Sequence, residues 1–195
     1  MIRSVGLRFT GNDRGTASSI SIMSETPPLF SPATSHTPGA DGFELLLHAI
    51  GAKAPTPGGG AVACYVGALG AALSTMVVNY STGKKNLAEH EPMLQASVGR
   101  LMRVREVLLQ LAEEDAQVYG LSNELSRLRE DDPRRAGLAA VQLASAQVPL
   151  SAAAACCDLL RLLFDLSTRT NRYLRSDLEI AAILAEAGIR TSACN

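Results

Sequence analysis

Apolar residues recur at three- and four-residue steps along most of the chain after residue 41, which is the spacing of amphipathic helices. The longest stripe begins near Glu91 and places the following residues on one helix face: Leu94, Val98, Leu101, Val104, Leu108, Leu111, Ala112 and Val118. Asp115 falls on the same stripe, whereas Glu113 and Glu114 point away from it as a solvated face. Because burying an isolated carboxylate is costly, we expect Asp115 to be paired, hydrogen-bonded or functional.

A different pattern, of small and aliphatic residues, extends from Thr56 to about Tyr80. Thr56 is predicted to cap a helix here and Pro57 to occupy its first position. The small residues share one face at three- and four-residue steps: Gly60, Cys64, Gly67, Ala71, Ser74 and Val78. Such a face allows another helix to approach closely.

Start and stop signals predict further helices. Asp41 can cap a short helix that ends at Gly51, and Asp132 followed by Pro133 begins a helix that extends toward Thr168. Residues 176–179 have the spacing of a capping box before the apolar run 180–189. Aromatic residues make up 4% of the chain and tryptophan is absent, which favours close-packed helices. The predicted fold is therefore all-α, an antiparallel bundle of long helices.

The first forty residues have another character. They are rich in Ser, Thr, Pro and Gly and lack periodicity, so residues 1–40 are predicted to be a disordered extension and residues 41–195 a single helical domain. Arg3, Arg8 and Arg14 with few acidic residues resemble a mitochondrial transit peptide, but the helical amphipathicity is poor. We expect a cytoplasmic protein, with mitochondrial targeting as the alternative.

The net charge and the spacing of the cysteines argue against several kinds of partner and site. A net charge of −1 gives no long-range attraction toward nucleic acid. The four cysteines contain no CxxC pair, which indicates neither a disulfide framework nor a zinc site. Residues 61–80 carry no charge and have the length of a membrane span. Much of this run is Ala, Gly, Ser, Thr and Asn, which gain little from transfer into lipid, so we favour a buried helix over a membrane anchor.

Three successive glycines at residues 58–60 stand at the predicted helix start. Their unobstructed N–H groups and the helix dipole would suit an anionic or oxygen-rich ligand. The alternative is a tight turn that requires positive φ. The sequence is not a Walker loop, and no predicted strand precedes it, which argues against a dinucleotide fold.

Five motifs in this order resemble one family: Pro-Thr-Pro-Gly-Gly-Gly at 55–60, Gly-Lys-Lys at 83–85, Glu-Glu-Asp-Ala at 113–116, Val-Pro-Leu at 148–150 and Ser-Asp at 176–177. The resemblance is to the cyclodeaminase/cyclohydrolase family, which includes the cyclodeaminase domain of formiminotransferase-cyclodeaminase and the stand-alone methenyltetrahydrofolate cyclohydrolases. It covers residues 43–195 and implies an all-helical domain that dimerises and acts on one-carbon units of tetrahydrofolate, without a metal or redox cofactor.

The resemblance also implies roles for particular residues. The folate-facing loop would comprise Thr56, Pro57, Gly58, Gly59 and Gly60. Lys84 and Lys85 would bind or polarise the substrate, and Asp115 and Asp177 would lie near the one-carbon centre, with Asp115 the better candidate for the base. The alternatives are a solvated helix end for the lysines and a first-turn helix acid for Asp177.

Two departures from the family bear on activity. The residues before Ser-Asp differ from the usual short turn, and the segment and long helix that follow the position of Asn195 in family members are missing here. We expect a methenyltetrahydrofolate cyclohydrolase, because the chain stands alone without an upstream transferase domain. The alternatives are a formiminotetrahydrofolate cyclodeaminase and, through loss of the terminal helix, a noncatalytic folate-binding or dimerisation module.

Overall fold

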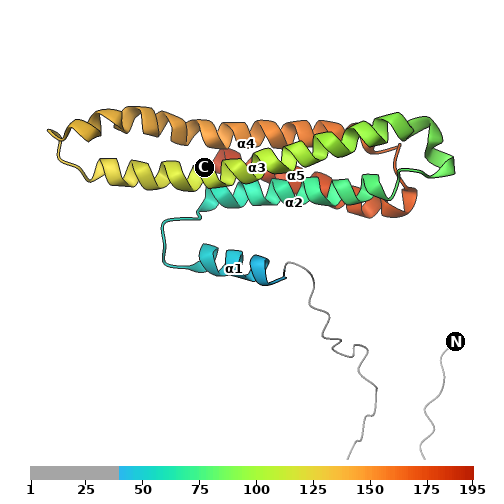
Figure 1. Cartoon of the computed structure of the whole chain (residues 1–195), viewed down its shortest axis with the longest axis horizontal. Coiled ribbons are helices and arrows are strands. Elements are labelled where there is room, and N and C mark those ends of the chain that lie inside the picture. The colour runs from blue at the N-terminus through green and yellow to red at the C-terminus, as the bar shows by residue number, and fades with distance from the viewer. Residues whose placement is uncertain (1–39) are drawn as a thin grey trace, which may run out of the picture. The chain divides into compact units, whose positions relative to one another are not determined.

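The computed structural model describes residues 40–195, which form five α-helices and three short 3-10 helices (Figure 1). The α-helices are α1 (Ala40–Gly51), α2 (Gly59–Asn79), α3 (Glu91–Ser126), α4 (Leu138–Leu166) and α5 (Arg175–Cys194). The 3-10 helices are η1 (Lys85–His90), η2 (Pro133–Gly137) and η3 (Arg172–Leu174). No strand occurs within this described range, which confirms the all-α class. The predicted disordered extension and transit peptide lie outside it, except that Ala40 already belongs to α1.

Helices α2 to α5 run up and down in turn and lie side by side along their lengths (Figure 1). Both α2 and α4 pack against α3 and α5, whereas α2 and α4 meet only weakly across the diagonal. Contacts between α2 and α5 fix their antiparallel direction, because Gly59 lies near Asn195 and the Ser81 hydroxyl accepts a hydrogen bond from the Asn171 N–H at 2.9 Å. The predicted antiparallel bundle is confirmed.

The small residues of α2 allow this close packing. All six residues of the predicted small face are buried. A Cβ added to Gly67 would lie 2.6 Å from the Cys156 sulfur of α4, and one added to Gly188 of α5 would lie 3.5 Å from the Gly67 Cα. Any larger side chain at Gly67 would push these helices apart.

The core consists of two clusters along the bundle. Leucines of α3, α4 and α5 surround Val77 and Val78 in the half near the end of α2. The half near the start of α2 is built from smaller residues, among them Ala61, Cys64 and Ala112. The apolar stripe of α3 supplies both clusters, with Leu94, Leu101 and Leu108 fully buried. Glu113 and Glu114 are exposed, as predicted.

The predicted helix starts were partly wrong. Thr56 does not cap α2 and Pro57 is not its first residue: a cis peptide joins them in the preceding loop, and α2 begins at Gly59 with Gly58 as N-cap. The capping box at residues 176–179 does not form, because η3 leads directly into α5 and Ser176 is already its second residue. The Asp132 carboxylate does accept a hydrogen bond from the Arg134 N–H at 2.9 Å, although the helix that it caps begins as the 3-10 helix η2.

Two helical segments are long and apolar enough to cross a membrane by length and composition, Gly59–Asn79 and Pro133–Leu166. In the most apolar window of the first, 56% of the residues are buried within the bundle. The central position of α2 between α3 and α5 accounts for its lack of charge. In the most apolar window of the second segment, 22% of the residues are buried, and Leu143 and Leu150 of α4 are exposed.

Candidate functional site

The start of α2 is held by a carboxylate from another helix. No side chain of the preceding loop caps α2, and the Asp115 Oδ2 of α3 instead accepts a hydrogen bond from the Ala61 N–H at 3.0 Å. A negative charge at a helix N-terminus is favoured by the helix dipole and by the free N–H groups of the first turn. The structure therefore brings together the glycine turn (residues 56–60) and the carboxylate that the apolar stripe singled out.

Gly60 makes this approach possible. A Cβ added there would overlap the Asp115 Oδ1 and lie 2.6 Å from the Asp115 Cγ. The alternative role predicted for the glycines, a turn with positive φ, is wrong: among the glycines of residues 40–195 only Gly83 has positive φ, at 74°. Gly60 is needed because a neighbouring side chain occupies the space that its own would fill.

Asp115 is half-buried, and burial raises its pKa above the ordinary value of 3.8. The hydrogen bond from the Ala61 N–H lowers the pKa and offsets only part of this effect. The Cys64 thiol lies nearby, and its pKa is raised to about 12, first by burial and then by the negative charge of Asp115. At neutral pH the thiol is therefore protonated and a poor nucleophile, which leaves Asp115 as the group that can exchange a proton here.

Asn195 is a third member of the cluster, and sequence reasoning missed it. Its Nδ2 atom lies 2.7 Å from the position of a Cβ on Gly60, and its Oδ1 atom lies 3.9 Å from the corresponding position on Gly59. The signal was present in α5, where the buried residues Leu178, Ala181, Ala185, Gly188 and Ser192 are spaced by three and four, and Asn195 continues that spacing. The cluster thus joins a carboxylate, a carboxamide and the open backbone of α2.

The other predicted site residues lie at the far end of the bundle. Lys84 and Lys85 are exposed and follow the end of α2. The 21 residues of α2 separate them from the glycine turn by about 30 Å. Asp177 is partly buried in the first turn of α5, which runs antiparallel to α2, so it lies at the lysine end. A single chain does not bring these three residues to Asp115.

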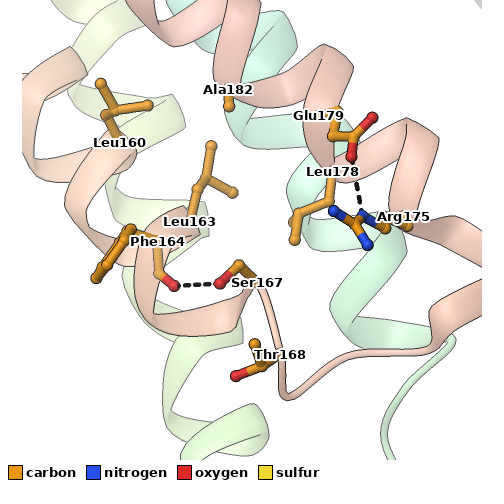
Figure 2. Close-up of a pocket in the computed structure, with 9 residues that line it drawn as sticks. All are labelled: Leu160, Leu163, Phe164, Ser167, Thr168, Arg175, Leu178, Glu179 and Ala182. Atoms are coloured by element: carbon orange, nitrogen blue, oxygen red, sulfur yellow. Dashed lines mark hydrogen bonds and ion pairs between the residues drawn. The ribbon is translucent and has the colours of Figure 1, made fainter.

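A cavity of about 380 Å³ opens between α4 and α5 at the lysine end (Figure 2). Leu160, Leu163 and Leu178 give it apolar walls. Its two charged residues pair with each other, since the Arg175 Nε lies 2.9 Å from the Glu179 Oε1. The cavity therefore offers no free carboxylate for acid–base chemistry. Across residues 40–195, no three His, Cys, Asp or Glu side chains gather as a metal would require.

The protein is an all-α helical bundle in which an inward-facing carboxylate lies against a helix N-terminus that glycine residues leave open. The chain belongs to the formiminotransferase-cyclodeaminase family, whose model matches residues 43–195. It is similar to the methenyltetrahydrofolate cyclohydrolase of Methylorubrum extorquens, with 31% identity over 167 residues that cover 80% of this chain and 78% of the relative.

Two further relatives support the assignment. The formimidoyltransferase-cyclodeaminase of Mus musculus is 29% identical over 145 residues, which cover 72% of this chain but only 27% of that protein. The crystal structure of formiminotetrahydrofolate cyclodeaminase from Thermotoga maritima superimposes with a TM-score of 0.72 at 28% identity, covering 77% of this chain and 74% of that one. The family resemblance seen in the sequence is confirmed.

Proposed function

We propose that this protein hydrolyses 5,10-methenyltetrahydrofolate to 10-formyltetrahydrofolate. The observation that carries the proposal is the Asp115 carboxylate, half-buried with a raised pKa and held against the Ala61 N–H beside Gly60. The similarity to a methenyltetrahydrofolate cyclohydrolase over most of both chains supports the choice of reaction.

In the proposed mechanism one group, Asp115, moves a proton twice. Asp115 accepts a proton from water as the water oxygen bonds to the methenyl carbon between N5 and N10. The tetrahedral carbon then loses its bond to N5, Asp115 returns its proton to N5, and the hydroxyl proton leaves to solvent as the formyl C=O forms on N10. A carboxylate also stabilises the cationic methenyl carbon electrostatically. No electron is transferred, and we propose that no metal or redox cofactor takes part.

The alternative reaction is that of a formiminotetrahydrofolate cyclodeaminase, which expels ammonia as the methenyl ring closes. The similarity to the Thermotoga maritima protein of that name favours it as the second candidate. Purified full-length protein should be given each substrate separately, with the methenyl absorbance and released ammonia followed. We expect rapid loss of methenyl absorbance and no ammonia from the formimino substrate. Ammonia release with slow methenyl hydrolysis would favour the cyclodeaminase, and folate binding without either reaction would indicate a noncatalytic module.

The raised pKa of Asp115 predicts opposite effects of pH on activity and stability. The base must be ionised, so kcat/KM should rise with pH through a midpoint above 3.8. The folded protein holds this proton more tightly than the unfolded chain, so the contribution of Asp115 to the free energy of unfolding is greatest below 3.8 and falls as pH rises through the raised pKa. A pH–rate profile checks the predicted rise of kcat/KM, and urea unfolding at each pH checks the predicted fall of the free energy of unfolding. An activity midpoint at or below 3.8 would argue against Asp115 as the base.

We further propose that the protein works as a homodimer in which the lysine end of one protomer meets the glycine turn of its partner. Support comes from the separation of about 30 Å between Lys84 and Gly60 along α2, which one chain cannot close. An isologous twofold interface pairs opposite ends of antiparallel helices and would create two such composite sites.

Mixing two impaired variants tests this composite site. Asp115→Asn should be nearly inactive, and the double variant Lys84→Ala, Lys85→Ala should have a strongly raised KM. After joint unfolding and refolding at equal amounts, heterodimers hold one intact site in two, so about a quarter of wild-type activity should return. No recovery, or a lysine double variant that behaves as wild type, would contradict a site shared between protomers.

A further inference from the structure

Next to the Asp115 cluster, α4 and α5 line a second cavity, of about 300 Å³, that is open to solvent. It is lined by Ala146, Pro149, Leu150 and Ala153 of α4 and by Ser192, Ala193 and Asn195 of α5. Asn195 contributes to both the cavity and the Asp115 cluster, since its carboxamide also lies against Gly60 beside Asp115. The cavity therefore adjoins the Asp115 cluster through a shared side chain, that of Asn195.

Building on the proposed function, we infer that this cavity binds the p-aminobenzoyl ring of the folate substrate. That ring is bonded directly to N10, one of the two nitrogens that flank the reacting carbon, so it must lie beside Asp115 during the reaction. A volume of 300 Å³ is at the lower end of the range for ligand pockets and suits one ring with its substituents, not a whole folate.

The chemistry of the walls favours the benzoyl ring over the pterin. Five of the seven lining residues are alanine, proline or leucine, which offer apolar side chains to the face of a ring. The pterin carries an amino group, a ring N–H and a carbonyl along one edge, and burying these without partners would be costly. The benzoyl ring has no polar atom of its own, and its amide needs one or two partners.

The two polar residues of the cavity fit that amide. The Ser192 hydroxyl is buried and, among the described residues, is the one such side-chain atom with no hydrogen-bond partner. The Asn195 carboxamide supplies a donor and an acceptor. A buried hydroxyl that lacks a partner is uncommon in native proteins, and rotation of the Ser192 side chain toward the adjoining cavity would let a ligand amide provide one.

The Val-Pro-Leu motif at residues 148–150 acquires a role in this arrangement. Val148 is buried in the small-residue core cluster and Pro149 is buried at the cavity wall. Leu150, the third residue, has 72% of its surface exposed although it lines the cavity. An exposed leucine adds little to folding, so its side chain is available for a ligand.

Leu150→Ala tests the inference without disturbing the fold, because the side chain is exposed and alanine favours helix. We expect KM for methenyltetrahydrofolate to rise about tenfold from the lost apolar contact, and the affinity for free p-aminobenzoylglutamate, measured by ligand-observed NMR, to fall similarly. Ala146→Leu, which fills the cavity from its exposed rim, should have the same effect. Leu143→Ala is the matched control, since Leu143 is 62% exposed on the same helix and does not line the cavity.

The binding measurement separates this inference from the proposed function. If the wild type binds p-aminobenzoylglutamate and Leu150→Ala weakens that binding, the ring site stands even where no turnover is found. If the wild type turns over methenyltetrahydrofolate and both variants keep its KM, the reaction stands and the ring site is wrong. A loss of affinity for 6-methyltetrahydropterin, with p-aminobenzoylglutamate unaffected, would place the pterin in the cavity and overturn the inference.

Discussion

Asp115→Asn is expected to lower kcat for methenyltetrahydrofolate hydrolysis by roughly 10²–10⁴-fold, the usual contribution of a positioned acid–base group. The asparagine amide oxygen can still accept the hydrogen bond that the Ala61 N–H gives to Asp115, so the start of α2 should keep its geometry. Removal of a partly buried charge should leave the protein at least as stable at neutral pH. Initial rates from the methenyl absorbance, with circular dichroism and thermal unfolding, measure both effects.

Glu114→Gln is the matched control for this substitution. Glu114 precedes Asp115 on α3, but its side chain is exposed and points about 100° away around the helix, so neutralising it should leave kcat within about twofold of wild type. Asp115→Asn with a near-normal rate would remove this carboxylate from the chemistry. If both variants lost activity equally, the overall charge of α3 would be responsible, and no specific role for Asp115 would remain.

Gly60→Ala is expected to have the second largest effect, a loss of kcat/KM of about 100-fold, because misplacing a catalytic group by an ångström has consequences of that order. The added methyl group would overlap the Asp115 carboxylate and lie 2.7 Å from the Asn195 Nδ2. One of these side chains, or the start of α2, must then move. The displacement should also lower the free energy of unfolding by about 1–3 kcal/mol, as overpacking does elsewhere.

Gly59→Ala provides the comparison for Gly60. A Cβ at Gly59 would meet its nearest atom, the Asn195 Oδ1, at 3.9 Å, which is an ordinary van der Waals contact. Alanine also suits the first turn of a helix, so this variant should fold and react nearly as wild type. Equal activities for the two variants would show that the close approach of Asp115 to Gly60 does not matter for catalysis.

The central part of the site could be predicted from the sequence because it depends on helical periodicity. Asp115 interrupts an apolar stripe, and Gly60 begins a face of small residues; both faces turn inward in any packed bundle. Helix contacts then bring the carboxylate and the glycine together. The exact start of α2 was less predictable, because a threonine followed by a proline suits an extended loop as well as it suits a helix start.

The placement of the lysines and of Asp177 depended on distances that periodicity does not encode. Lys84, Lys85 and Asp177 carry suitable charges, yet their place in the topology puts them at the other end of α2. Asn195 continues the spacing of the buried face of α5, but its side chain is uncharged and it belongs to no recognised motif, so the sequence reasoning missed it. Its proximity to Gly60 arises from the antiparallel packing of α2 and α5 over their full length.

A crystal structure of the Asp115→Asn variant with methenyltetrahydrofolate would test the location of the reaction most directly. We predict that the methenyl carbon lies within about 4 Å of the side chain at position 115, with the one-carbon unit facing Gly60 and Ala61. Folate bound only at the distant end of its own chain or its partner, near Lys84 and Asp177 and away from position 115 of every protomer, would contradict the proposed site.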